Sequence, residues 1–444
     1  LKIFFVNHHL SHASSFFLSP FNESSILTVD AFGEKQCIGL YTAKKNKIEK
    51  IFEQDFPHSL GSFYSTFTEF CGFKPKSEEW KLMGASAYGK KSTYEKKIEN
   101  LIRFDSKNNF FLDLKYFNHY LFHRPGYVNK YLEKYLGIKK NKLNKKLSQK
   151  YFDIAYAAQN VFEKIYLNLA KNIYKQNSSK NLVIAGGAAL NCVANGKIIS
   201  QTSFKKVFIP PFPDDSGAGI GAALYINSMI NPKNSKLKFS NNYLGPSYGD
   251  NTIEKTLKKF KINYEKIDDI FETAAESIIS GKIIAWFQGS LEFGDRALGN
   301  RSILADPRNH LMKDKINKSI KYREDFRPFA PAIMTEKVKD YFEKSQDSNF
   351  MEKALLVKID KKKLIPAVVH ADGSGRLQTV SKENNYKFYN LIKRFYDKTD
   401  IPVLLNTSFN VQGEPIVCSI EDAIKNFYLS GLDELYIGSY KVKK

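Results

Sequence analysis

The sequence predicts an α/β protein built from two domains, and three observations support this fold class. Its 444 residues exceed the size at which a single hydrophobic core is usual. Several segments repeat the order strand, glycine-rich turn, helix, which is typical of α/β domains. Residues 229–238 (MINPKNSKLK) lack apolar periodicity and contain Pro, Asn and Ser. We therefore expect a linker there, between domains at residues 1–230 and 238–444.

The first domain is expected to begin with strands and to end with strand-turn-helix units. Runs of β-branched and aromatic residues predict three successive strands within SILTVDAF, CIGLYTA and KIEKIFEQDF. Helical patterns follow in LGSFYSTFTEFCGF and, at greater length, in YFDIAYAAQNVFEKIYLNLAKNIYKQ. A buried strand, a double glycine and a helix are predicted in NLVIAGGAALNCVANGKIIS, before the strand KVFIPP and the helix SGAGIGAALYINSM.

The second domain is expected to contain a mixed rather than a parallel sheet. The segment ETAAESIISGKIIAWFQGS predicts a helix that leads into a strand. Later strand patterns alternate with loops rich in Arg, Asn and Gly instead of with regularly spaced helices. We therefore expect a second α/β domain.

Composition narrows the class of protein. No apolar run approaches the roughly 18 residues of a membrane span, and the start LKIFFVNHHL has no signal-peptide pattern. We expect a cytoplasmic protein without a membrane partner, and the scattered cysteines are expected to be reduced. Because the first residue is Leu, we expect the chain to be part of a longer product. The net charge of +22 would suit nucleic acid, but the lysines are spread along the chain, so that partner is disfavoured.

Histidines concentrate in the stretch VNHHLSHASSF, residues 6–16, although the chain has only eight. Such rings are often satisfied by backbone carbonyls. In a helix, however, His8 and His12 lie one turn apart and can direct both rings to one point. Asp30 ends a hydrophobic strand, and Asp215 precedes a glycine-rich helix that it could instead cap. Two imidazoles and two carboxylates form a ligand set that suits iron, manganese or zinc as a Lewis acid.

Two further groups of residues indicate anion binding. In AGGAALN, Gly186 and Gly187 follow a buried strand, so the backbone can approach a ligand and a helix N-terminus can face an anion. The second domain gathers arginines beside Gly and Pro, and arginine forks match phosphate and carboxylate oxygens. The candidates for this polyanion pocket are Arg296, Arg301, Lys321, Arg323, Arg327, Arg376, Ser408 and Asn410.

Six motifs together resemble the carbamoyltransferase family of the NodU and TobZ type, from residue 6 to about residue 440. They are HHLSHA, AGGAALNCVANGKI, EFGDRALGNRSILADPR, FRPFAPAI, DGSGRLQTV and NTSFNVQGEPIVCS, in the order that this family has. The resemblance implies a Kae-like domain of the actin/Hsp70 superfamily, followed by a YrdC-like domain. Family members carry a further segment before the histidine motif, so the first domain is expected to lack its first strands.

The resemblance also implies roles for individual residues. His8, His12, Asp30 and Asp215 match iron-binding positions, with Fe(II) or another divalent metal as the ion. Gly186, Gly187 and Asn191 match a nucleotide loop. Lys321 and Arg323 resemble a K-x-R pair, and Ser408 and Asn410 an S-x-N motif, of YrdC proteins. The implied catalytic residues are His12, Asp215, Lys321 and Arg323.

The function expected from this resemblance is ATP-dependent O-carbamoylation. The YrdC-like half would make carbamoyl adenylate from carbamoyl phosphate and ATP, and the Kae-like half would pass the carbamoyl group to a hydroxyl of a sugar or sugar-like acceptor. A tRNA threonylcarbamoylation enzyme is the alternative within the superfamily, and a non-catalytic nucleotide-binding fragment is an alternative of another class. A homodimer is left open.

Overall fold

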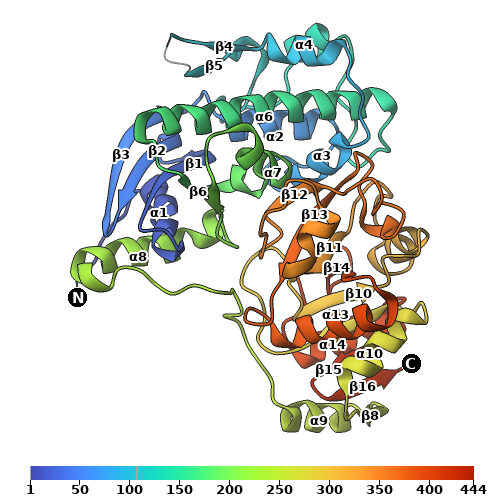
Figure 1. Cartoon of the computed structure of the whole chain (residues 1–444). Helices are drawn as coiled ribbons and strands as arrows, with labels where there is room; N and C mark the ends of the chain where they lie inside the picture. The colour runs from blue at the N-terminus through green and yellow to red at the C-terminus, as the bar shows by residue number, and fades with distance from the viewer. Residues whose placement is uncertain (1, 107–108) are drawn as a thin grey trace. The chain divides into compact units, whose positions relative to one another are not determined.

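The computed structural model describes residues 2–106 and 109–444, and the chain divides into two compact units (Figure 1). The first unit ends at Phe239 and the second runs from Ser240 to Lys444. The predicted linker at 229–238 is therefore part of the first unit, and its first residues are helical because α8 continues to Ile230. The helix ends before Pro232, since the residue preceding a proline disfavours helical backbone.

The first unit is built around a mixed five-stranded sheet in the order β3-β2-β1-β6-β7. β1 pairs antiparallel with β2 and parallel with β6. The strands are β1 (Glu23–Gly33), β2 (Gln36–Lys44), β3 (Lys47–Asp55), β6 (Asn181–Ala185) and β7 (Lys206–Phe208), and the short β4 (Ile102–Phe104) and β5 (Phe110–Leu112) form a separate pair. The predicted strands before and after the glycine turn are thus confirmed.

Eight α-helices accompany this sheet among the described residues, and the long α6 extends across the unit (Figure 1). They are α1 (His8–Ala13), α2 (Leu60–Phe70), α3 (Glu79–Ser86), α4 (Thr93–Glu99), α5 (Lys130–Leu136), α6 (Gln149–Asn177), α7 (Cys192–Gln201) and α8 (Ala218–Ile230). Ala13, Ile26 and Leu224 share one buried apolar cluster, which joins α1, β1 and α8. Gly221 allows the close approach, because a Cβ there would lie 1.9 Å from the Ser11 carbonyl oxygen. This packing anchors the helix that carries the histidines.

The second unit contains a nine-stranded mixed sheet in the order β12-β13-β11-β14-β10-β9-β15-β16-β8. The strands are β8 (Tyr264–Lys266), β9 (Ile284–Phe287), β10 (Arg301–Ala305), β11 (Ala330–Met334), β12 (Lys353–Leu356), β13 (Ser374–Val380), β14 (Val403–Ser408), β15 (Glu434–Ile437) and β16 (Tyr440–Lys443). β11 pairs parallel with β13 but antiparallel with β14. The expected mixed α/β class is confirmed in both units.

Six helices accompany this sheet among the described residues. They are α9 (Asp250–Lys259), α10 (Ile270–Ile279), α11 (Met312–Ile316), α12 (Val338–Tyr341), α13 (Tyr386–Thr399) and α14 (Ile420–Leu429). A five-residue π-helical segment, Asn317–Lys321, extends α11 and leads into Tyr322 at φ 46°. Over the described part of the chain, no helix has the length and apolarity needed to cross a bilayer.

Candidate metal centre and cation cluster

The first site forms where α1 meets the end of β1. Asn7 caps α1, since its side-chain oxygen accepts from the backbone N–H of Leu10 at 3.3 Å. Glu34 holds the start of the helix: its carboxylate accepts from the Asn7 amide at 2.6 Å and from the His8 backbone N–H at 3.3 Å. The hairpin turn after β1 therefore fixes the helix that presents both histidines.

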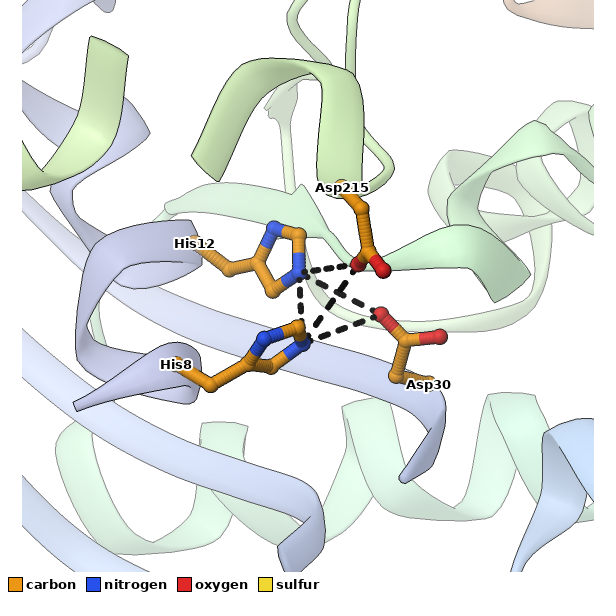
Figure 2. A group of neighbouring side chains, drawn as sticks. All are labelled: His8, His12, Asp30 and Asp215. Carbon is orange, nitrogen blue, oxygen red and sulfur yellow. Dashed lines mark hydrogen bonds and ion pairs between the residues drawn. The ribbon is translucent and has the colours of Figure 1, made fainter. Parts of the chain in front are cut away.

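His8, His12, Asp30 and Asp215 converge on one point, and we call this group the candidate metal centre (Figure 2). One potential ligand atom from each residue lies within 4.8 Å of the others. The two Nε2 atoms are 3.1 Å apart. Oδ2 of Asp30 lies 3.2 Å from His12 Nε2, and Oδ1 of Asp215 lies 3.5 Å from the same atom.

These separations fit ligands that share one ion. Two atoms each about 2.1 Å from a metal, with angles between 90° and 110° at the metal, lie roughly 3.0–3.4 Å apart. The nitrogen–nitrogen distance of 3.1 Å falls in this range. Depending on the tautomers, one Nε2 can donate a hydrogen bond to the other, or both lone pairs can face one ion. The donor set therefore fits a divalent transition metal, which His8, His12, Asp30 and Asp215 would hold.

In the candidate metal centre, the pKa values of His12 and Asp30 depend strongly on the neighbouring side chains. Burial by itself would lower the pKa of His12, but hydrogen bonds to Asp215 and Asp30 outweigh it and raise the pKa to about 9. Burial would raise the pKa of Asp30, yet hydrogen bonds from His12 and His8 hold it far below its usual range. His12 is almost completely buried, whereas the Asp215 side chain is 76% exposed. The centre is thus open to a ligand on the Asp215 side.

The double-glycine loop supports both carboxylates of the centre. The Gly187 N–H donates to Oδ2 of Asp30 at 3.2 Å, and the Gly186 N–H donates to the Pro213 carbonyl at 2.6 Å, two residues before Asp215. Gly186 has φ +92°, and a Cβ there would lie 2.3 Å from the Val29 carbonyl oxygen. Both N–H groups, which the sequence assigned to a nucleotide loop, are therefore engaged by the protein.

The side chain of Asn191, the third predicted residue of that loop, is hydrogen-bonded to other residues of the first unit. Its side-chain oxygen accepts from the Ala194 N–H at 3.0 Å and so caps α7. Its amide also exchanges two hydrogen bonds of 3.0 Å with the amide of Gln159 on α6. A nucleotide could contact this side chain only after these bonds break.

In the second unit, Lys321 lies against the end of β14. Its ammonium donates to the Asn410 side-chain oxygen at 2.7 Å and to the Asn410 and Ser408 carbonyls at 2.9 and 2.5 Å. The Ser408 hydroxyl donates to the same Asn410 oxygen at 2.7 Å. The two motifs predicted from sequence, K-x-R and S-x-N, thus come together although about 90 residues separate them.

Lys321 belongs to a group of neighbouring cations that we call the cation cluster: Lys321, Arg323, Arg327 and Arg376. Burial, followed by the positive charges of Arg323 and Arg327, lowers the pKa of Lys321 well below its usual value. Burial, followed by the charges of Arg327 and Arg376, does the same to the pKa of Arg323. Cations gather in this way at the cost of mutual repulsion, which an anionic ligand would relieve.

The guanidinium of Arg323 is only partly satisfied. Its Nε donates to the Asn317 side-chain oxygen at 2.7 Å, and the group lies 4.6 Å from the Phe329 ring centre. Its Nη2 is buried and has no hydrogen-bond partner among the described residues. An unpaired buried donor costs about 1–3 kcal/mol, so this nitrogen is a candidate contact for an acceptor atom of a ligand.

The two other predicted arginines are placed differently. Arg301 is completely buried on the Phe287 ring, and its two terminal nitrogens donate to the carbonyls of Gln288, Gly289, Asn300 and Pro246. These two nitrogens could bind a phosphate only by giving up these bonds, while its Nε is buried without a hydrogen-bond partner among the described residues. Arg296 is half-buried, with a 3.5 Å contact to the Asp295 carbonyl. The charges of Arg296 and Arg301 are not among those that lower the pKa of Lys321 or Arg323, so neither residue belongs to the cation cluster.

Sequence reasoning missed three residues that organise these sites. Glu34 holds Asn7 and His8, Gly33 makes room for the His8 ring, and Asn317 orients Arg323. Gly33 and Glu34 lie in the turn between two predicted strands, only three and four residues after Asp30. Their position in the sequence could therefore have indicated that they lie near the candidate metal centre. Asn317 precedes Arg323 by six residues, and only the π-helical segment brings the two together.

The described residues thus present a candidate transition-metal centre in the first unit and a candidate anion site in the second. Comparison with known families identifies the class of protein. The family model described as "Carbamoyltransferase N-terminus" matches residues 1–224, and "Carbamoyltransferase C-terminus" matches residues 275–444. The chain belongs to the carbamoyltransferase family and is an enzyme of that family.

Individual relatives extend over the whole chain. Uncharacterized protein sll1178 of Synechocystis is 39% identical, with 100% of this chain and 76% of that protein aligned. Nodulation protein NolNO of Sinorhizobium fredii is 35% identical, covering 100% of this chain and 64% of that protein. Uncharacterized protein MJ1051 of Methanocaldococcus jannaschii is 35% identical, with coverage of 100% and 83%. The chain thus spans roughly two thirds to four fifths of these relatives.

Proposed function

We propose that this chain is an ATP-dependent O-carbamoyltransferase that forms carbamoyl adenylate from carbamoyl phosphate and ATP. It then transfers the carbamoyl group to a hydroxyl of a sugar or sugar-like acceptor. The proposal includes the assignment of residues 1–230 as a Kae-like transfer domain and residues 238–444 as a YrdC-like adenylate-forming domain. The observation that supports it is that one chain of this family contains both a candidate metal centre of four side chains and a cluster of cations that includes buried Lys321 and Arg323.

In the proposed first step, water cleaves carbamoyl phosphate to carbamate and inorganic phosphate. A carbamate oxygen then attacks the α-phosphorus of ATP, and the bond to pyrophosphate breaks. Charge accumulates on phosphate oxygens throughout this step. Arg323 offers a buried, unpaired N–H, and Lys321 is held rigidly by Ser408 and Asn410. Preorganised cationic donors of this kind stabilise developing negative charge more than water does.

In the proposed second step, the acceptor hydroxyl oxygen attacks the carbamoyl carbon, and the bond to AMP breaks. A divalent metal such as Fe(II), when bound, would supply Lewis acidity to polarise a carbonyl oxygen. The protein's part is to hold the two imidazoles and two carboxylates in place, with Asp215 on the exposed side, where an acceptor can approach. The catalytic roles of His12, Asp215, Lys321 and Arg323 belong to this proposal.

The two half-reactions can be tested separately. Exchange of labelled pyrophosphate into ATP, in the presence of carbamoyl phosphate, reports adenylate formation, and carbamoylated acceptor reports transfer. We expect Arg323→Ala to suppress exchange, and Asp215→Ala to retain exchange but abolish transfer. Arg394→Ala is the control, because Arg394 is an arginine of the same unit that pairs with Asp269 on the surface.

Two outcomes would contradict the proposal. Equal loss of exchange in Arg323→Ala and Asp215→Ala would show that the chemistry is not divided between the two sites. Absence of both exchange and transfer in the unmutated chain, loaded with metal, would favour a nucleotide-binding protein without this activity.

A further inference from the structure

Three aromatic rings of the first unit form a group, and one of them, Phe32, follows Asp30 of the candidate metal centre by two residues. Phe32, Phe56 and Phe122 form this group, which we call the aromatic platform. The rings of Phe56 and Phe122 are stacked, with centres 5.8 Å apart and planes at 19°. The Phe32 ring centre lies 5.2 Å from that of Phe56 and 6.1 Å from that of Phe122. Phe122 is 73% exposed and Phe32 is 37% exposed, so ring faces remain open to solvent.

The backbone fixes the platform beside the centre. Phe32 lies between Asp30, a member of the centre, and Gly33, where a Cβ would lie 1.9 Å from Cδ2 of the His8 ring. Two residues of extended chain span at most about 7 Å, so Phe32 cannot be remote from Asp30. The loop that carries Phe56 is tied to the same place, since the Ser59 hydroxyl donates to the Asp30 carbonyl at 3.2 Å.

Polar groups surround the rings. The ammonium of Lys76 lies 5.9 Å from the Phe32 ring centre and 5.8 Å from that of Tyr127. His123 and Arg124, which follow Phe122, are both exposed. A small apolar surface with a polar rim suits a ligand that has one apolar face and hydroxyl groups at its edges.

We infer that the aromatic platform binds the ring of the acceptor, a pyranose, while one of its hydroxyls reaches the candidate metal centre. This inference rests on the proposed function. An acceptor whose hydroxyl reacts at the centre must rest its remaining atoms on the surface that borders the centre, and the platform is such a surface. The negative faces of aromatic rings attract the partly positive C–H groups on one side of a pyranose, and Lys76 can donate to its oxygens.

Binding can be measured without turnover. Saturation-transfer NMR on the intact chain, with saturation of aromatic protons, would use methyl pyranosides of glucose, galactose, mannose and N-acetylglucosamine as probes. Sorbitol, an open-chain polyol, is the ligand control. We expect saturation of ring C–H protons for at least one pyranoside, its loss in Phe122→Ala, and its retention in Phe122→Trp. No saturation of any of these pyranosides would overturn the inference.

A matched variant separates the platform from exposed aromatics in general. Phe104 on β4 is 42% exposed in the same unit and takes part in no ring pair with the platform. With a carbamoylated pyranoside as product, Phe122→Ala should raise the acceptor KM about two- to tenfold with little change in kcat, as expected for the loss of one aromatic contact. Phe104→Ala should change neither constant. Pyrophosphate exchange and metal content should be the same in both variants.

The outcomes distinguish this inference from the proposed function. An unchanged acceptor KM in Phe122→Ala, with transfer intact, would overturn the platform and leave the proposed function standing. Pyranoside saturation without exchange or transfer would overturn the proposed function but not the binding surface. If Phe122→Ala instead converted a dimer to a monomer by light scattering, the rings would be an interface between two copies, and the inference would be wrong.

Discussion

The candidate metal centre and the cation cluster are opposite arrangements of polar groups. In the first unit, two imidazole nitrogens and two carboxylate oxygens face one another. In the second unit, donors gather, and the buried Nη2 of Arg323 has no acceptor among the described residues. Burial of each charged group carries a desolvation cost, and neighbouring cations also repel one another. Under the proposed function, the first arrangement holds a metal cation and the second holds a phosphate-bearing anion.

A third cluster, around the buried carboxylate of Glu434, differs from both sites because its charge is fully hydrogen-bonded by the protein. The Glu434 carboxylate accepts from Ser277 at 2.6 Å, from Tyr436 at 2.9 Å and from Lys282 at 2.6 Å, and Lys441 lies 3.2 Å away. All of these partners come from the protein itself. This cluster is structural, and it provides a reference for the two sites above.

The largest expected effect is a loss of metal affinity at the candidate metal centre. In the double variant His8→Ala, His12→Ala, two of four ligands are lost, so metal affinity should fall by far more than the roughly 10–100-fold caused by losing an outer-shell partner. Elemental analysis after gel filtration would measure this. His123→Ala, which removes an exposed histidine of the same unit, should keep its metal, and unchanged metal content in the double variant would rule out this ligand assignment.

The next largest effect is expected from removing the buried negative charge of Glu434. Glu434→Gln should destabilise the second unit by about 3–5 kcal/mol, because Lys441 would remain buried without its carboxylate. Urea unfolding would measure the change. A cost below about 1 kcal/mol would mean that the buried pair contributes little.

The same carboxylate predicts a pH dependence. Burial would raise the pKa of Glu434, but hydrogen bonds from Lys282, Ser277, Tyr436 and Lys441 outweigh it and lower the pKa from 4.5 to about 2. Because the folded pKa is below the unfolded one, this stabilisation is present above pH 4.5 and is lost as the pH falls towards 2. The difference in unfolding free energy between wild type and Glu434→Gln should therefore shrink over that range.

The proposed phosphate binding by the cation cluster can be tested by changing Lys321. Lys321→Met keeps most of the length of the side chain but removes its charge, so phosphate binding should weaken by about 1.5–3 kcal/mol, the contribution of one charge-assisted contact. Calorimetry with carbamoyl phosphate and with an ATP analogue would test this. Wild-type affinity for both ligands would show that the ammonium serves only to hold Ser408 and Asn410.

A smaller effect is expected from displacing a ligand without removing it. In Gly33→Ala, the new methyl group would collide with the His8 ring, at 1.9 Å, and should lower metal affinity by about 10–100-fold. Gly219→Ala is the matched control, since nothing lies within 4 Å of a Cβ at this position in α8. Equal metal affinity in the two variants would show that the His8 ring can move freely.

The smallest effect decides between two roles of Asn191. As the cap of α7, its replacement by Ala should cost about 1 kcal/mol and leave nucleotide affinity unchanged. Asn129→Ala removes a comparable cap, that of α5, and should cost a similar amount. A selective loss of nucleotide affinity in Asn191→Ala would instead support the nucleotide contact that the sequence predicts.

Much of the architecture and the outline of the first site followed from local sequence. Strand and helix patterns are short-range properties, so β1, β2, β3 and α6 could be predicted closely. The spacing of His8 and His12 is also local, because one helical turn determines which side chains share a face. Their convergence with Asp30 and Asp215 could be expected from strand ends, and the metal itself remains a proposal.

Which polar groups are already engaged was decided only by the tertiary structure. In sequence, Arg301 and Arg323 look alike, as do Asn191 and Asn410. In the fold, both terminal nitrogens of Arg301 donate to backbone carbonyls and only its Nε is buried without a partner in the described part of the chain, whereas Arg323 keeps a terminal nitrogen, Nη2, unpaired. A hydrogen bond needs a partner within about 3 Å, and the partners of these side chains come from segments far away in the chain. Composition and spacing determine which chemical groups the chain carries, and packing determines which of them remain available for a ligand.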